Sequence, residues 1–177
     1  MIETERLTLR PHRLEDFEAF HAMAVDPEVT EFIAAGIAAT REESWTKLMR
    51  NGGHWSFFGY GLLAIVERAS GRYVGQTGLA DFHRGLGERF DPFPEAAWAV
   101  ASPVHGRGYA TEAPAAAHRW FDEAIGPTPT VCIIDTENAS SLRVAEKLGY
   151  RPFGEVQYKG KRVMQFERTA AAARSGA

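Results

Sequence analysis

The stretch from Glu95 to Glu112, E-A-A-W-A-V-A-S-P-V-H-G-R-G-Y-A-T-E, constrains this chain more than any other. Its apolar segment from Ala96 to Ala101 leads through a proline into a turn that contains Gly106 and Gly108, and this turn opens an alanine-rich helix. Glycine lets the backbone approach a ligand closely, and the first N–H groups of a helix have no acceptor inside the helix. The pattern therefore predicts an anion-binding turn between a strand and a helix.

Two common phosphate-binding motifs do not match this turn. A dinucleotide fingerprint requires a third glycine where this chain has Thr111, and a Walker loop requires Gly-Lys-Ser/Thr five residues after Gly106. Taken alone, the stretch leaves open a simpler alternative, in which a capped helix packs on a strand and binds no ligand.

The composition bounds the classes of function. A chain of 177 residues, 45% hydrophobic and 24% charged, is typical of one soluble domain. Its formal charge is −3 and no cluster of lysine and arginine stands out, so we do not expect nucleic acid as the main ligand. Because the sequence contains neither a long apolar run nor a signal-peptide pattern, we expect a cytoplasmic protein that does not bind or span a membrane.

Neither cysteine nor histidine indicates a metal or a thiol site. Cys132 is the only cysteine and lies in an apolar run, where a free thiol usually behaves as a small buried hydrophobe. None of the six histidines stands in an H-x-H or H-x-x-x-H arrangement, so no metal is predicted.

Hydrophobic periodicity predicts a mixed α/β domain over residues 1–168, followed by a disordered tail over residues 169–177. We expect strands at 6–10, 61–67, 73–82, 95–101, 130–135, 153–156 and 162–167, and helices at 14–24, 40–50, 109–124 and 139–148. Thr40 and Glu43 would form a capping box for the second helix, which would end at Gly52 and Gly53. Pro114 conflicts with a helix that begins at Gly108, and it predicts either a bend or a later start near Thr111.

A second stretch, Asn138 to Tyr150, reads N-A-S-S-L-R-V-A-E-K-L-G-Y and resembles a signature of the GNAT N-acetyltransferase superfamily, Asn-x-x-Ser/Ala followed by Lys-x-Gly-Phe/Tyr. The segment from His105 to Ala110 resembles the acetyl-coenzyme A pyrophosphate loop of the same superfamily, although His105 departs from the usual Gln or Arg. With residues 3–11 and 75–79, the chain resembles the RimJ/RimL-like branch. The resemblance implies a mostly antiparallel sheet of six or seven strands, splayed between its fourth and fifth strands, with helices on both faces.

The resemblance also implies a site for acetyl-coenzyme A. Backbone groups of Trp98, Ala99 and Val100 would bind the pantetheine arm, which Asn138 would also reach, and Ser141 would face the thioester sulfur. The pyrophosphate loop would consist of His105, Gly106, Arg107, Gly108, Tyr109, Ala110 and Thr111. Arg107 and Lys147 would add positive charge there, although an ordinary surface position explains either cation equally well.

The expected general acid is missing. Many members of the superfamily have a tyrosine seven residues after the asparagine, and this chain has Ala145. Ser141 is the nearest substitute, whereas Tyr150 is expected in the core. Glu95 is our candidate for the general base, acting directly or through water.

Three further residues are alternatives for the base. Asp81 and His83 have the two-residue spacing of one strand face and would line the same cleft, and Glu137 lies beside an expected helix cap. Each of these charges is equally well explained by an ordinary solvated position.

The resulting expectation is an acyltransferase that moves an acetyl group from acetyl-coenzyme A directly to a primary amine. A protein N-terminus is the leading acceptor by analogy with the branch. The alternatives are a small-molecule amine, whose pocket residues 54–60 and 84–94 would wall, and a non-catalytic acyl-coenzyme A module. Monomer and homodimer both remain open.

Overall fold

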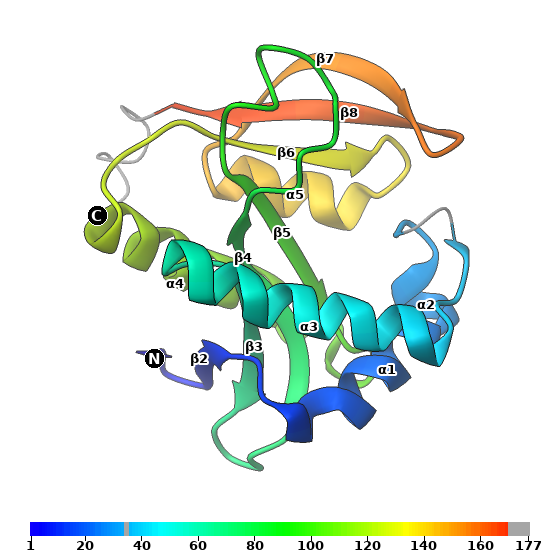
Figure 1. Cartoon of the computed structure of the whole chain (residues 1–177), viewed down its shortest axis with the longest axis vertical. Helices are drawn as coiled ribbons and strands as arrows, with labels where there is room; N and C mark the ends of the chain where they lie inside the picture. Colours follow the sequence, from blue (N-terminus) through cyan, green and yellow to red (C-terminus); the bar gives the residue numbers. More distant parts are fainter. Residues whose placement is uncertain (34–35, 170–177) are drawn as a thin grey trace.

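Eight strands form one sheet in the computed structural model of the chain, which describes residues 1–33 and 36–169 (Figure 1). The sheet order is β1-β2-β3-β4-β5-β6-β8-β7, and every neighbouring pair is antiparallel except β5 and β6. The strands are β1 (Ile2–Glu3), β2 (Leu7–Pro11), β3 (Leu62–Glu67), β4 (Tyr73–Ala80), β5 (Glu95–Val100), β6 (Thr130–Asp135), β7 (Arg151–Tyr158) and β8 (Lys161–Arg168). The expected mixed α/β fold with a mostly antiparallel sheet is confirmed. The additional strand, β1, is too short to show a sequence pattern.

The sheet opens between its two parallel strands. Glu95 and Val131 form the only residue pair in the β5–β6 register, and the Val131 N–H donates to the Pro94 carbonyl at 3.0 Å. Beyond this point β5 pairs only with β4, where Trp98 stands opposite Thr77. The expected splay in the middle of the sheet is therefore confirmed.

Helices cover both faces of the sheet. They are the 3-10 turns Leu14–Asp16 and Ser102–Val104 and the α-helices α1 (Phe17–Val25), α2 (Pro27–Thr30), α3 (Arg41–Phe58), α4 (Tyr109–Ala124) and α5 (Ala139–Lys147). Leu9 of β2 packs in one core cluster with Ala113 and Ala117 of α4. The adjacent Arg10 points to the opposite face and pairs with Asp16, directly before α1. Figure 1 shows α3 crossing in front of the strands from that same face.

Helix α3 is eight residues longer at its C-terminal end than the glycine pair predicts, because it continues from Arg50 to Phe58. The Thr40–Glu43 capping box is confirmed, but Gly52 and Gly53 lie inside the helix, which ends at Gly59 with φ 71°. Tertiary contacts outweigh the low helical propensity of glycine here. The last turns are fixed by Trp55, whose indole N–H donates to the Leu62 carbonyl at 2.9 Å.

Helix α4 begins at Tyr109, so the later start near Thr111, one of the two alternatives that Pro114 left open, is wrong. The Thr111 and Glu112 N–H groups both donate to the Gly108 carbonyl, at 3.0 and 3.1 Å, and they close the first turn. Pro114 is fully buried inside the helix. Its ring lacks the N–H that would bond to the Ala110 carbonyl.

Other boundaries shift for local reasons. Strand β4 ends at Ala80, before His83, which has a left-handed φ of 49°. Strands β7 and β8 extend further than expected and meet at Lys159 and Gly160, whose φ values of 51° and 79° have the signs of a type I′ hairpin turn. Residues 170–177 of the expected tail lie outside the described residues.

Cys132 is buried in a core cluster with Phe121 and Tyr150, as predicted. Within residues 1–33 and 36–169, no helix is both long enough and apolar enough to cross a membrane.

Two glycine substitutions should have opposite effects on stability. A Cβ on Gly75, which has φ 156°, would lie 2.4 Å from the Ala99 carbonyl oxygen, so Gly75→Ala should lower the free energy of unfolding by about 3 kcal/mol. Gly53 is helical with open space around it, so Gly53→Ala should raise that energy by about 0.5–1 kcal/mol. Urea denaturation of both variants measures the difference. Equal effects would contradict the close β4–β5 contact.

Candidate functional site

The turn before α4 presents free backbone amides. Gly106 and Gly108 have φ values of 76° and 81°, which side-chain-bearing residues rarely adopt. Among the residues that the structure describes, the N–H groups of Gly106, Gly108, Tyr109 and Ala110 have no hydrogen-bond acceptor. Free amides at the start of a 16-residue helix form an arrangement suited to a phosphate group.

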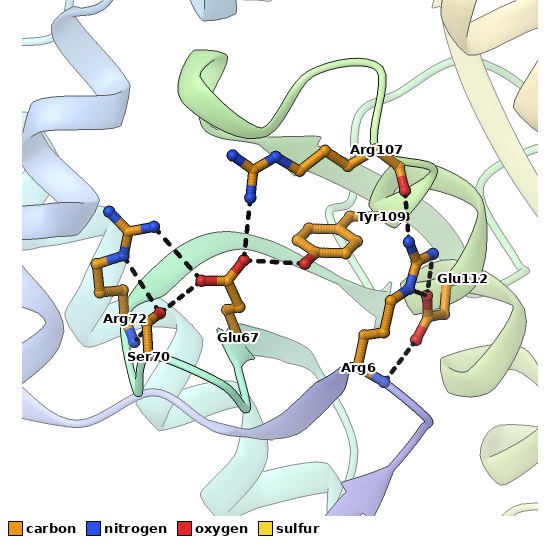
Figure 2. A network of polar contacts seen from close by, with 7 residues as sticks. All are labelled: Arg6, Glu67, Ser70, Arg72, Arg107, Tyr109 and Glu112. Carbon is orange, nitrogen blue, oxygen red and sulfur yellow. Dashed lines mark hydrogen bonds and ion pairs between the residues drawn. The ribbon is translucent and has the colours of Figure 1, made fainter.

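A buried carboxylate at the end of β3 anchors this turn (Figure 2). Glu67 accepts hydrogen bonds from the Tyr109 hydroxyl at 2.9 Å, from Arg107 Nη1 at 3.3 Å and from Ser70 at 2.5 Å. The hydrogen bonds from Ser70 and Tyr109 hold the pKa of Glu67 below its usual range. The Tyr109 side chain is thus buried in the core, and only its backbone faces the turn.

Arg6 anchors the same turn from the N-terminal segment. Its guanidinium donates to the Arg107 carbonyl at 2.8 Å and pairs with Glu112 in the first turn of α4. Figure 2 shows Glu67 and Arg6 reaching the turn from two different segments. Both cations that lie closest to the turn, Arg6 and Arg107, therefore already have carboxylate partners, and the unpaired donors are the backbone amides.

The predicted residues of β5 border the opening in the sheet. Trp98, Ala99 and Val100 are half-buried and pair only with β4. His105 places its Nε2 atom 3.0 Å from the Val100 carbonyl oxygen, at the end of this strand. The strand thus offers backbone groups along the edge that β6 leaves open.

Asn138 and Ser141 lie beyond the C-terminal end of β6. The Ser141 N–H donates to Asn138 Oδ1 at 3.0 Å, so Asn138 is the N-cap of α5. The Ser141 hydroxyl has no hydrogen-bond partner within the described part of the chain. Because the C-terminal ends of parallel strands share one edge, these residues and the glycine turn lie on the same side of the opening. Lys147 is exposed at the other end of α5, about 13 Å along the helix from Asn138.

Glu95 lies at the closed end of the opening and is only 4% exposed. Its two carboxylate oxygens accept from Arg84 Nε at 2.5 Å and Nη2 at 2.9 Å, and Arg84 Nη1 donates to the Tyr158 hydroxyl at 2.7 Å. Burial raises the pKa of Glu95 above its usual range, and Arg84 opposes that rise. Arg84 was expected only as part of the pocket wall 84–94 and not as a partner of Glu95, and Tyr158 was not predicted, because their approach to Glu95 depends on the course of a long loop and a distant hairpin.

The three alternative acids and bases are dispersed. The Asp81 carboxylate accepts a hydrogen bond from the Tyr60 hydroxyl at 2.5 Å. The backbone N–H of Asp81 donates to His54 Nε2 at 2.9 Å. His83 is exposed in the loop after β4, and Glu137 is exposed beside Asp135. No group of three His, Cys, Asp or Glu side chains that could hold a metal occurs within residues 1–33 and 36–169.

Tyr150 belongs to a buried hydrogen-bond chain. His118 Nδ1 lies 2.7 Å from the Pro114 carbonyl oxygen, so this nitrogen carries the proton and Nε2 accepts from the Tyr150 hydroxyl at 2.9 Å. Thr130 Oγ1 lies 2.8 Å from the same hydroxyl. Burial lowers the pKa of His118 to about 4, which keeps the ring neutral. The Tyr150 hydroxyl proton is therefore used in a hydrogen bond inside the core. Ala145 is fully buried in the same core cluster.

Comparison with known proteins shows the family and the fold of the chain. A family model described as the acetyltransferase (GNAT) domain matches residues 6–151, and the chain belongs to this family. A structure assigned to GNAT acetyltransferases, from Bordetella pertussis, is 34% identical with a TM-score of 0.85, over 95% of this chain and 98% of that one.

More distant structures share the fold. An acetyltransferase from Agrobacterium tumefaciens is 28% identical with a TM-score of 0.77, over 94% of this chain and 92% of that one. The spermidine N-acetyltransferase from Vibrio cholerae, in complex with coenzyme A and spermine, is 14% identical with a TM-score of 0.75, over 97% and 99% of the two chains. At 14% identity, the likeness to the Vibrio cholerae enzyme shows the fold alone.

The buried position of Tyr150 predicts a purely structural phenotype. Tyr150→Phe removes the hydroxyl that joins His118 and Thr130, so the free energy of unfolding should fall by about 1–3 kcal/mol. Acetyl-transfer rates of the folded variant should stay within about twofold of the wild type. Urea denaturation and steady-state kinetics measure the two effects, and a loss of turnover without a loss of stability would contradict the purely structural role of Tyr150.

Proposed function

We propose that this protein is an acetyl-coenzyme A dependent N-acetyltransferase of the cytoplasm that transfers the acetyl group directly to a primary amine. Membership of the GNAT acetyltransferase family supports the acetyl transfer. The observation that carries the proposal is the alignment of three features on one side of the sheet opening, namely the free amides at Gly106 to Ala110, the unpaired edge of β5 and the Asn138 cap.

The residues present fit acetyl-coenzyme A. The amides of the glycine turn would hold its pyrophosphate, and a Cβ on Gly106 would meet nothing within 4 Å, so the turn is open on that side. The unpaired edge from Trp98 to Val100 would bind the pantetheine arm in the manner of an added strand. The thioester supplies an activated acetyl carbonyl, and β5 N–H groups would polarise it.

The proton balance requires little from the protein. The amine nitrogen bonds to the acetyl carbon, the carbon–sulfur bond breaks, the amine gives up a proton, and the thiolate takes one. An α-amino group with a pKa of about 8 costs about 1.4 kcal/mol to deprotonate at pH 7, whereas a lysine with a pKa near 10.4 costs more than about 4. We propose Glu95 as the base, through water, because burial raises its pKa and makes it a stronger base than an ordinary carboxylate. Ser141 would donate a proton to the leaving sulfur and recover one from solvent.

The acceptor is proposed from the RimJ/RimL-like resemblance of the motifs, which favours a protein N-terminus. We predict that a screen of N-terminal peptides and small amines will show coenzyme A release with at least one primary amine. A thiol-reactive dye measures this release, and mass spectrometry locates the added acetyl group on nitrogen. Tight acetyl-coenzyme A binding without turnover on any acceptor would instead support the non-catalytic module.

The pairing with Arg84 gives a test of the base. Arg84 lowers the pKa of Glu95, so Arg84→Gln should raise that pKa and move the acid limb of the kcat profile to higher pH. Glu95→Gln should reduce kcat mainly at low pH, where little free amine exists, and more for amines of high pKa. Both profiles are measured at saturating substrate.

The two variants separate a base from a structural ion pair. A structural pair alone would lower the stability of both variants and leave the shape of the kcat profile unchanged. Circular dichroism of each variant checks that the folded protein is being assayed.

A further inference from the structure

Arg50, in the middle of α3, is a cation without a carboxylate partner among the residues that the structure describes. Its guanidinium lies 5.4 Å from the centroid of the Phe82 ring, and that of Arg84 lies 4.7 Å from the same centroid. No hydrogen bond or ion pair involves the Arg50 side chain within residues 1–33 and 36–169. We call Arg50, Phe82, Arg84, Glu95 and Tyr158 the arginine cluster.

The arginine cluster has one positive charge in excess. Arg84 is neutralised by Glu95, with which it forms two hydrogen bonds. The nearby carboxylates of Asp81 and Asp91 are engaged elsewhere, by Tyr60 and by the Leu86 and Gly87 amides. The guanidinium of Arg50 is therefore the group whose charge the cluster leaves uncompensated.

The surroundings make that uncompensated charge unfavourable. Nearby protein atoms and then the charge of Arg84 lower the pKa of Arg50, although the residue remains accessible to solvent. A carboxylate that reached Arg50 would meet five N–H donors in a planar group suited to two parallel hydrogen bonds. An anionic ligand would thus offset the repulsion from Arg84 with an opposite charge.

The loop that supplies Arg84 is held in a strained conformation. His83 has a φ of 49°, a left-handed value that residues with a side chain rarely adopt. This residue separates Phe82 from Arg84, whose guanidinium folds back over the Phe82 ring. On the other side, the buried Asn51 fixes α3 next to Arg50 by donating to Gln76 of β4 at 3.3 Å. Two separate elements thus hold the cluster in place.

The cluster also adjoins the proposed base, since Arg84, which contacts the same Phe82 ring as Arg50, donates two hydrogen bonds to Glu95. We propose that Arg50, supported by Arg84, binds a carboxylate of the acceptor, so that the substrate is a primary amine that also bears a carboxylate. This inference rests on the proposed acetyl transfer and specifies its acceptor. The carboxylate belongs either to a free amino acid or to an acidic residue at a peptide N-terminus. A polycationic amine would be repelled.

Substrate pairs that differ only in charge test the proposal. We compare the standard amino acids with their amides, peptides beginning with Asp or Glu with those beginning with Asn or Gln, and spermidine as a polycation. For one of the two carboxylate-bearing sets, the free amino acids or the acidic peptides, the wild-type kcat/KM should be at least about tenfold higher than for the neutral counterparts. Preference for free amino acids or for acidic peptides identifies the source.

Arg50→Gln should lower kcat/KM about 10- to 100-fold for the carboxylate-bearing acceptor, mainly through KM, and leave the neutral counterpart within about twofold. Arg50→Lys should restore part of the loss. Lys47→Gln, one turn earlier on α3, removes the same charge and should retain the wild-type preference. Wild-type preference for amides or spermidine, or an equal loss on both members of a pair, would overturn the proposal.

A binding measurement separates this inference from the proposed function. Calorimetric titration of the same amino acids and peptides into the coenzyme A-bound protein reports the anion site without turnover. Binding that Arg50→Gln abolishes would support the site even where no acetyl transfer occurs. Absence of carboxylate-dependent binding to the wild type would overturn it even where neutral amines are acetylated.

Discussion

The separation of β5 from β6 is the constraint on which the rest of the structure depends. The two strands touch at Glu95 and Val131 and then diverge, so one edge of β5 remains without a ladder partner. Unpaired backbone groups are costly when they are buried away from water, and a ligand with amide groups of its own can satisfy them. The divergence therefore turns the middle of an otherwise continuous sheet into a binding edge, with helix starts at its open end and the Arg84–Glu95 pair at its closed end.

Close backbone packing keeps β5 in place despite its free edge. Gly75 lets β4 approach the Ala99 carbonyl, and Gly78 lets β4 approach the Gly61 carbonyl, each at a distance that a side chain would prevent. On the face behind this pair, the alanines of α4 bring the helix close to the strands. The strand that would bind pantetheine is thus positioned by small residues, and the glycine turn that follows it is positioned by Glu67 and Arg6.

Sequence reasoning was accurate where the signal is local. The Thr40–Glu43 capping box, the Asn138 cap and the glycine turn each depend on residues within a few positions of one another, and all three occur as predicted. It was wrong where distant contacts decide the outcome. Trp55 and Asn51 keep α3 helical through its two glycines by donating hydrogen bonds to Leu62 and Gln76. No short-range sequence pattern predicts these two acceptors.

The candidate site shows the same division. The residues carried over from the motifs lie on β5, in the turn after it and at the start of α5, apart from Lys147, because the motifs encode a local turn and a local cap. Arg50 and Tyr158 were not predicted, and Arg84 was expected only as part of the loop 84–94, because the three come from a helix, a hairpin and a long loop that meet only in the folded chain. For Glu95, the sequence indicated a carboxylate near the closed end, but not that both of its oxygens would be occupied.

The two ends of the opening would recognise anions by different means. At the glycine turn, Arg107 and Arg6 are paired with Glu67 and Glu112, so the available donors are backbone amides, which substitution of most side chains leaves in place. At the arginine cluster, the available donor is a single side chain. A fold built in this way can keep one cosubstrate while its acceptor changes, because one substitution on α3 alters the charge that the acceptor meets and leaves the amides of the turn untouched.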